Sequence, residues 1–241
     1  MRVAVYISPA YKLIKAIMRP LLMVVTKRDW RGAEHLPKSG GVVVAANHTS
    51  YFDPLAVGHF VVDNGRAPRF LGKVEVFKNP ILGRLFKAAG QIPVHRGTAI
   101  AAVALRDAIA GLERGECIVV YPEGTTTLDP DLWPMKAKTG AARMALMANV
   151  PLIPVAQWGP EKVIPDKAFK IRLFPIKTMQ VHAGPPVDLD DLRGKELTSE
   201  LLEEATERIM KAITELLAEI RGEEPPAERF DPRKRRGGAS S

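Results

Sequence analysis

The two side chains in this chain best suited to chemistry are a histidine and an aspartate five positions apart, His48 and Asp53. Imidazole is the one side chain whose unperturbed pKa lies near neutrality, and a carboxylate on its second nitrogen fixes the tautomer and supports the cation. On one continuous helix the two side chains would point about 140° apart, so a turn must bring them together. Pro54 favours such a turn, because proline suits the first position of a following helix. The pair is predicted to be a general base with its orienting group, although this spacing alone more often joins two unrelated polar residues.

A second polar cluster, Pro122 to Thr127, follows the apolar run from Cys117 to Tyr121. Gly124 permits a backbone conformation barred to other residues and lets a ligand approach the main chain. The three threonines add hydroxyl donors without bulk. By itself the cluster is better explained as a glycine turn with threonines capping a helix. A second polar cluster at the end of an apolar run nevertheless strengthens the functional interpretation of the first.

Both clusters need strands to position them. Val42 to Ala46 is a short, mostly β-branched run after two glycines, which indicates a buried strand that delivers His48 to one edge of a sheet. Further strands are predicted at 70–77, 91–97, 117–121, 149–155, 169–174 and 179–182, and helices at 55–62, 79–90, 98–115, 138–147 and 199–221. The alternation predicts an α/β fold, with a mostly parallel central sheet flanked by helices.

The N-terminal stretch differs from the rest in charge and pattern. Residues 1–31 carry seven basic residues against Asp29, a net charge of +6. Apolar residues recur near helical spacing over 9–25, which is typical of an amphipathic helix in a membrane interface. A helix packed on the core of its own domain fits the pattern equally well. We predict a membrane-interface helical segment at 1–28, one catalytic domain at 29–221 and a disordered basic tail at 222–241.

Composition narrows the classes of partner and of site. The net charge of +8 and pI near 9.6 imply an anionic partner such as a membrane surface, a phosphorylated substrate or nucleic acid. Aromatic residues make up only 6% of the chain and no basic stretch is interleaved with them, so nucleic acid is not expected. Cys117 is the only cysteine, which excludes an internal disulfide, and the sequence has no metal-type cluster of His and Cys. No stretch reaches the roughly 20 apolar residues of a spanning helix.

Four segments together resemble the glycerolipid acyltransferase family that contains the lysophosphatidate (1-acylglycerol-3-phosphate) acyltransferases. They are the His-x4-Asp block at 47–53, the block from Gly72-Lys73 through Pro80 and Gly83 to Pro93-Val94-His95-Arg96, the Pro-Glu-Gly-Thr block at 122–125, and the apolar strand block at 150–155. The segments stand in the family's order and cover roughly residues 40–160. Each is weak alone, and four in order are a strong signal.

The resemblance implies a direct acyl transfer. His48 would take the proton from an acceptor hydroxyl, which attacks the thioester of acyl-CoA or acyl carrier protein, while Asp53 orients the imidazole. Glu123, Gly124 and Thr125 would bind the acceptor's glycerol phosphate, and Lys73 and Arg96 would hold its phosphate. No cofactor and no metal are expected. The family's substrates place such an enzyme on the cytoplasmic face of a membrane, as a peripheral protein on an anionic surface.

One departure from the family bears on the acceptor. Family members usually have Arg and then Ser after Glu-Gly-Thr, whereas this chain has Thr126 and Thr127. Lys138 is therefore added to the expected substrate-binding residues, since Lys73, Arg96, Lys136 or Lys138 could supply the missing cation. The open alternatives are another lyso-lipid, glycerol 3-phosphate or a glycolipid as acceptor. A hydrolase and a non-catalytic basic membrane-binding module are less favoured.

Overall fold

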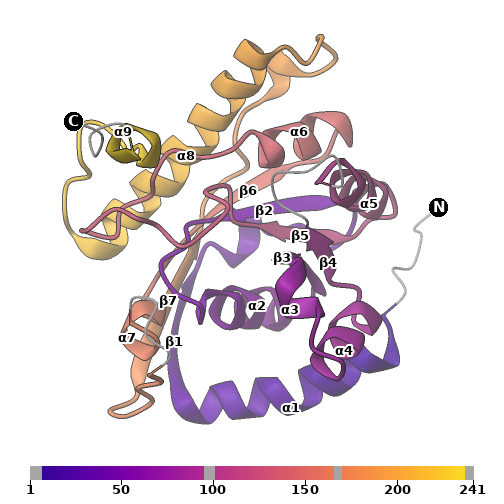
Figure 1. Ribbon diagram of the computed structural model, residues 1–241, viewed down its shortest axis with the longest axis vertical. Coiled ribbons are helices and arrows are strands. Elements are labelled where there is room, and N and C mark those ends of the chain that lie inside the picture. The colour runs from indigo at the N-terminus through magenta and orange to yellow at the C-terminus, as the bar shows by residue number, and fades with distance from the viewer. Residues whose placement is uncertain (1–6, 95–100, 166–169, 237–241) are drawn as a thin grey trace.

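The computed structural model describes residues 7–94, 101–165 and 170–236. A seven-stranded sheet with the order β1-β7-β6-β2-β5-β3-β4 crosses the molecule (Figure 1). Its strands are β1 (Thr26–Arg31), β2 (Val42–Ala46), β3 (Pro68–Lys73), β4 (Ile92–Val94), β5 (Cys117–Val120), β6 (Leu152–Trp158) and β7 (Lys177–Ala183). All neighbouring strands pair in parallel except β6 and β7. The predicted α/β fold with a mostly parallel sheet is confirmed.

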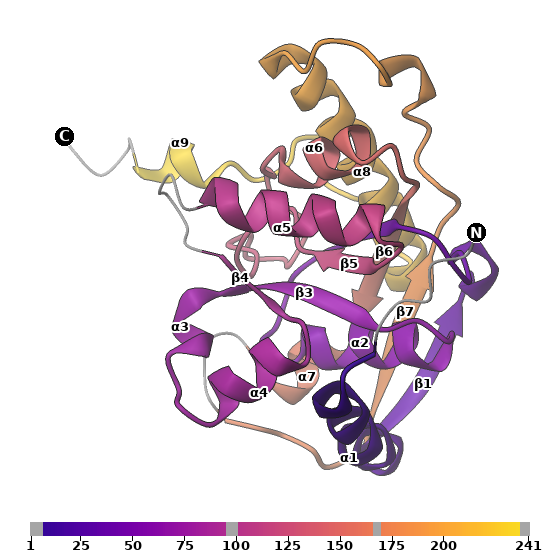
Figure 2. The ribbon, with the colours of Figure 1, turned by 90° about the vertical axis from the view of Figure 1, so that its right-hand side faces the viewer.

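Helices cover both faces of the sheet, as the burial of β2 on both sides requires. Every side chain of β2 is fully buried. Val43 and Ala45 pack with α5 (Ala101–Glu113), α6 (Gly140–Met147) and α8 (Ser199–Arg221). The alternate residues Val42, Val44 and Ala46 pack on the opposite face with α2 (Asp53–Asp63) and with Leu22 of α1 (Pro9–Val25). Figures 1 and 2 show the two helical layers above and below the sheet.

Short helices fill the connections. They are η1 (Ala33–His35), α3 (Val74–Phe77), α4 (Leu82–Ala88), α7 (Pro160–Val163), η2 (Asp190–Leu192) and α9 (Pro232–Arg236). The long helix predicted at 199–221 is α8, whose first turn is capped when the Thr198 hydroxyl accepts the N–H of Leu201. It ends at Gly222, which adopts the left-handed conformation at φ 65°.

Two strand predictions were wrong. No strand was predicted at β1, which continues directly from α1 into the sheet and pairs with β7 from Thr26↔Lys177 to Arg31↔His182. A strand of mostly polar and charged residues is readily overlooked, but an edge strand needs only its backbone to pair. The strand predicted at 169–174 is absent from residues 170–174, which form an extended loop before β7. Because β1 starts at Thr26, the expected boundary at residue 28 falls inside a strand.

Part of the tail that was expected to be disordered has defined contacts with the domain. The Phe230 carbonyl accepts the N–H of Lys136 at 2.9 Å, and Asp231 lies 3.6 Å from the Lys136 ammonium. Arg229 forms an ion pair with Glu207 of α8. Residues 237–241 lie outside the described part of the chain. Within that part, no helix combines the length and the apolar character needed to cross a bilayer.

Candidate active site

Some of the predicted site residues lie close together because four parallel strands end at one edge of the sheet. β2, β5, β3 and β4 are consecutive neighbours, so their carboxyl ends lie side by side. His48 follows β2, Tyr121 follows β5, and Lys73 is the last residue of β3. Arg96 falls just beyond β4, outside the described residues, so its predicted role stays a prediction.

His48 and Asp53 form a hydrogen-bonded pair. The distance from His48 Nδ1 to Asp53 Oδ2 is 2.8 Å, and the Asp53 side chain is fully buried. The same oxygen accepts the N–H groups of Thr49 at 2.6 Å and Ser50 at 2.9 Å. Asp53 also begins α2, where the helix dipole favours a negative charge. These contacts fix the carboxylate so that it holds Nδ1–H and leaves Nε2 to accept a proton.

The turn that carries His48 is itself tied to the surrounding loops. The Asn47 side chain exchanges hydrogen bonds with the main chain of Gln157 on β6, at 2.8 and 3.1 Å. The Gln157 amide in turn donates to the Asn47 carbonyl at 2.9 Å. The His48 carbonyl accepts the N–H of Thr127 at 2.6 Å. The backbone position of the imidazole is therefore set by contacts from two other segments.

Glu123 has a different position from the one its predicted role requires. Its Oε1 accepts the His48 N–H at 2.8 Å and its Oε2 accepts the Met135 N–H at 3.0 Å. The residue is only 3% exposed and does not line the cavity beside His48. Burial raises the pKa of the Glu123 carboxyl to about 8, and the two backbone hydrogen bonds work in the opposite direction. The Glu123 carboxyl therefore links the loop at 122–127 to the backbone of the His48 turn.

Tyr121 contacts His48 but was not among the predicted site residues. Its ring stacks on the His48 imidazole, with centroids 4.2 Å apart and planes 20° from parallel. Phe70 of β3 continues the stack at 6.4 Å. The aromatic residue at the end of the apolar run before Pro122 was a usable signal. Its contact with His48 depends on the pairing of β2 with β5, which a linear reading does not supply.

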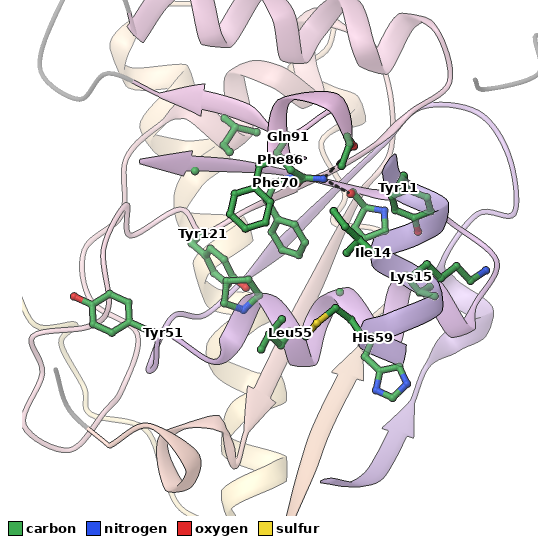
Figure 3. A pocket seen from close by; sticks show the side chains of 18 of the residues that line it. Tyr11, Ile14, Lys15, Tyr51, Leu55, His59, Phe70, Phe86, Gln91 and Tyr121 are labelled. Atoms are coloured by element: carbon green, nitrogen blue, oxygen red, sulfur yellow. Dashed lines mark hydrogen bonds between the residues drawn. The ribbon is translucent and has the colours of Figure 1, made fainter. Parts of the chain in front are cut away.

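A cavity of about 580 Å³ opens beside His48. Figure 3 shows Tyr121 and Phe70 on the sheet side, Leu55 and His59 from α2, and Tyr11, Ile14 and Lys15 from α1 opposite them. Further apolar lining comes from Met18, Leu22, Val62, Leu71, Phe77 and Phe86. A mostly apolar cavity that opens beside an imidazole is suited to an acyl chain.

The remaining predicted substrate residues divide into two groups. Lys73 lines the cavity together with His48, and so does Thr126, the residue that departs from the family pattern. Gly124 adopts φ +76°, and the Lys138 side chain lies against it, about 3.3 Å from where a Cβ would stand. Thr125 is half-buried in the same loop and, like Gly124 and Lys138, does not line the cavity. Lys136 instead pairs with Asp231.

Two side chains that are common nucleophiles in acyl transfer, Ser50 and Cys117, are not poised to form an acyl-enzyme. The Ser50 hydroxyl donates to the Ile164 carbonyl at 2.9 Å and accepts the Phe52 N–H at 3.1 Å. Cys117 is buried in β5, and burial raises the pKa of its thiol to about 12. A thiol held neutral in this way is a poor nucleophile. The geometry therefore suits direct attack by a hydroxyl that His48 deprotonates.

Comparison with known proteins agrees with this geometry. A family model described as acyltransferase matches residues 27–158, more than half of the chain. The chain thus belongs to the acyltransferase family, and it is an O-acyltransferase. The matched region contains β1 from its second residue on, the His48 turn, the cavity strands and the Glu123 loop.

Several relatives carry a more specific name. The 1-acyl-sn-glycerol-3-phosphate acyltransferase of Bacillus subtilis is 27% identical over 76% of this chain and 86% of its own length. A chloroplastic enzyme of that name from Brassica napus is 29% identical over 58% of this chain, but the match spans only 39% of the plant protein. The crystal structure of the 1-acyl-sn-glycerophosphate acyltransferase PlsC from Thermotoga maritima is similar with a TM-score of 0.67 and 25% identity, covering 86% of this chain and 80% of that one.

Proposed function

We propose that this enzyme transfers a fatty acyl group from a thioester, acyl-CoA or acyl carrier protein, to the free hydroxyl of lysophosphatidate, giving phosphatidate. The observation that carries the proposal is the His48–Asp53 hydrogen bond of 2.8 Å at the edge of an apolar cavity. The names of the relatives support lysophosphatidate as the acceptor. Transfer needs no cofactor, because the thioester already supplies an activated acyl group.

The chemistry follows from which nitrogen is free. His48 Nδ1–H donates to Asp53, so Nε2 accepts the proton of the acceptor hydroxyl. The hydroxyl oxygen forms a bond to the thioester carbonyl carbon, and the carbon–sulfur bond breaks as the tetrahedral intermediate collapses. The imidazolium then returns its proton to the departing thiolate. Asp53 stabilises the imidazolium and keeps its charge throughout.

Phosphate recognition would rely on the cations at the same sheet edge. Lys73 lines the cavity, and we propose that its ammonium holds the acceptor's phosphate together with Arg96. Lys138, lying against Gly124, would add charge from the neighbouring loop, and Thr125 a hydroxyl. Glu123 would contribute by holding the backbone of His48 rather than by touching the acceptor.

The substrates of such a reaction reside in a bilayer, and α1 is built to meet one. Its inner side lines the cavity through Tyr11, Ile14 and Met18, while Leu13 and Ile17 on its outer side are 55% and 57% exposed. A helix that is apolar on both sides suits a position between a lipid surface and an acyl cavity. We propose a peripheral enzyme on the cytoplasmic face of an anionic membrane.

A second acceptor class has one observation in its favour. Thr126 lines the cavity where family members usually carry an arginine, so the site lacks one phosphate-binding cation. The same reaction on glycerol 3-phosphate, another lyso-lipid or a glycolipid fits this difference.

Acceptor profiling separates these possibilities. Pure protein is incubated with acyl-CoA and each acceptor in turn, and products are identified by mass, with His48→Ala as the blank. We expect phosphatidate as the main product. Thr126→Arg gives a second test, and we expect it to leave transfer to lysophosphatidate unchanged or to tighten binding of this acceptor. Preferred acylation of a different acceptor, with a sharp loss in Thr126→Arg, would replace lysophosphatidate as the substrate.

A further inference from the structure

Large apolar side chains are exposed on three segments that are distant in sequence. The outer side of α1 exposes Leu13, Ile17, Leu21 and Val24, by 50% to 71%. Ile81, in the turn before α4, is 77% exposed. In the loop at 170–177, Ile171 is 63% exposed, Phe174 78% and Ile176 41%. A soluble surface seldom exposes so many large apolar side chains in so few segments, and a contiguous patch of this kind marks an interaction site.

The three segments lie at one end of the molecule. β1 and β7 pair in parallel with Thr26 opposite Lys177, so the residues just before them, Val25 and Ile176, enter the sheet side by side. The α1 helix and the loop at 170–177 are therefore neighbours at the sheet's edge, as both views show (Figures 1 and 2). The α4 helix packs against α1 from the other side. We call the exposed residues of 7–28, 78–88 and 170–177 the basal surface.

The basal surface has one sign of charge. Its segments contain eleven basic residues, which are Lys12, Lys15, Arg19, Lys27, Arg28, Lys78, Arg84, Lys87, Lys170, Arg172 and Lys177. None of the chain's 27 acidic residues falls in these segments. Arg19 and Arg28 are paired with Asp63 of α2, at 2.6 and 3.1 Å. The other nine cations form no ion pair with the acidic residues that the structure describes. Exposed apolar side chains among such cations match the two components of an anionic phospholipid surface.

We propose that the loop at 170–177 is a second membrane contact that acts together with α1, with Phe174 and Ile171 entering an anionic phospholipid bilayer and Lys170 and Arg172 binding its head groups. The inference deepens the proposed peripheral location and rests on it. A bilayer fits better than a second copy of the chain, because a symmetric dimer through this surface would bring two sets of like-charged cations together, only two of each set being paired with Asp63.

The second contact would also fix the orientation of the enzyme. An enzyme bound through one amphipathic helix can rotate about the axis of that helix on the membrane. A second contact, at the loop before β7, would leave the membrane if the enzyme rotated, so the two contacts together fix its orientation. The inner side of α1 lines the cavity, so a fixed α1 holds the cavity next to the lipid. The loop thus gives the helix a defined rotation as well as added affinity.

Vesicle sedimentation tests the proposal without any need for turnover. The full chain and the variant Ile171→Ser/Phe174→Ser are mixed with vesicles of neutral lipid alone or of neutral and anionic lipid. We expect the double variant to lose at least about tenfold in partitioning, since two large apolar side chains no longer enter the lipid. The matched control is Met147→Ser, because Met147 is 51% exposed on α6, on the opposite side of the sheet, and this change should leave binding unaltered.

A charge variant and an activity readout complete the test. Lys170→Glu/Arg172→Glu should reduce binding to anionic vesicles and leave weak binding to neutral ones unchanged. Transfer between water-soluble short-chain substrates should be unaffected in every one of these variants. A double serine variant that binds both vesicles like the wild type would overturn the proposal. So would a shift of that variant from dimer to monomer in ultracentrifugation with unchanged vesicle binding, which would make the surface an interface between copies. Failure of acyl transfer in the wild type would count against the proposed function alone.

Discussion

The sheet edge that carries His48 and Asp53, which we call the catalytic edge because of its proposed role, lies close to the basal surface. The two regions differ in burial and in hydrogen bonding. At the catalytic edge, Asp53 is fully buried and one of its oxygens accepts three hydrogen bonds, two of them from backbone N–H groups. At the basal surface, Phe174 and Val24 are exposed by 78% and 71%. Precision at the reacting atoms requires buried, fully hydrogen-bonded groups, whereas contact with a fluid lipid surface requires apolar side chains that are free to enter it.

This contrast means that substitutions in the two regions should fail in different ways. Changes at the catalytic edge should lower turnover while vesicle binding persists. Changes at the basal surface should lower vesicle binding while the chemistry on water-soluble substrates persists.

Asp53→Asn should have the largest effect of any catalytic-edge change apart from the loss of His48 itself. The amide is nearly the same size but carries no charge, so it stabilises the imidazolium poorly and can hold the wrong tautomer. We expect turnover to fall by about 10²- to 10⁴-fold with little change in vesicle binding. Steady-state kinetics and sedimentation on the same preparation check it. A drop of less than about threefold would mean that Asp53 does not orient the base.

Glu123→Ala should cost both stability and turnover. The change leaves the N–H groups of His48 and Met135 buried without an acceptor, each at about 1–3 kcal/mol. Urea denaturation should show a loss of free energy of unfolding of that size, and turnover should fall because the His48 turn is loosened. Glu113→Ala, at an exposed position on α5, serves as the control. If the acceptor's KM rises while turnover and stability are kept, Glu123 binds the acceptor directly, as the family resemblance suggested.

Lys73→Ala should act mainly through acceptor affinity. Loss of a charge-assisted hydrogen bond to phosphate costs about 1.5–3 kcal/mol, which corresponds to roughly 10- to 150-fold. We expect the loss in the acceptor's KM, because a phosphate remote from the reacting hydroxyl is bound equally in the ground and transition states. The control is Lys38→Ala, which removes an exposed lysine outside the cavity lining. An unchanged KM would remove Lys73 from the phosphate site.

A final expected effect concerns stability alone: its pH dependence should carry a contribution from Glu123. Burial raises its pKa to about 8 in the folded chain, above the 4.5 of the free group. Between these two pH values, Glu123 keeps its proton in the folded chain and loses it in the unfolded chain. The stability that the protonated carboxyl contributes is therefore full below about pH 4.5 and is lost as pH rises to about 8.

Denaturation of wild type and Glu123→Gln at pH 5, 6.5 and 8 measures this contribution, since glutamine does not titrate. The wild type should lose stability relative to the variant as pH rises, with a slope of at most about 1.4 kcal/mol per pH unit. If the difference in free energy of unfolding between wild type and Glu123→Gln stays constant, or grows in favour of the wild type, the Glu123 carboxyl is ionised across this pH range.

The sequence was sufficient to predict the sheet edge and the pairing of His48 with Asp53 at it, for identifiable reasons. β2 is buried on both faces, so it appears as an unbroken apolar run, and the residues after it must lie at the end of a strand. The same reasoning placed Tyr121 at the end of a strand, whereas the strand predicted at 70–77 ends earlier, at Lys73, and residues 74–77 form α3. Long, periodic α8 was predicted over its full length, because its apolar and charged residues alternate at helical spacing.

The features that the sequence did not reveal depend on contacts between distant segments. β1 pairs through its backbone at the sheet's edge, so its charged side chains gave no strand signal. The inward direction of Glu123 depends on N–H groups 75 and 12 positions away, those of His48 and Met135. The stack of Tyr121 on His48 requires β2 to lie beside β5. Each of these is a property of the pairing order, which local pattern does not encode.

Transfer by His48→Ala tests the central claim most directly. Pure wild type and variant are incubated with acyl-CoA and lysophosphatidate, and phosphatidate is quantified by mass, with vesicle binding and urea denaturation measured on the same samples. We expect the variant to lose transfer by at least about 10²-fold while it folds and binds vesicles like the wild type. Near-wild-type turnover in a folded His48→Ala variant would contradict the assignment of His48 as the general base.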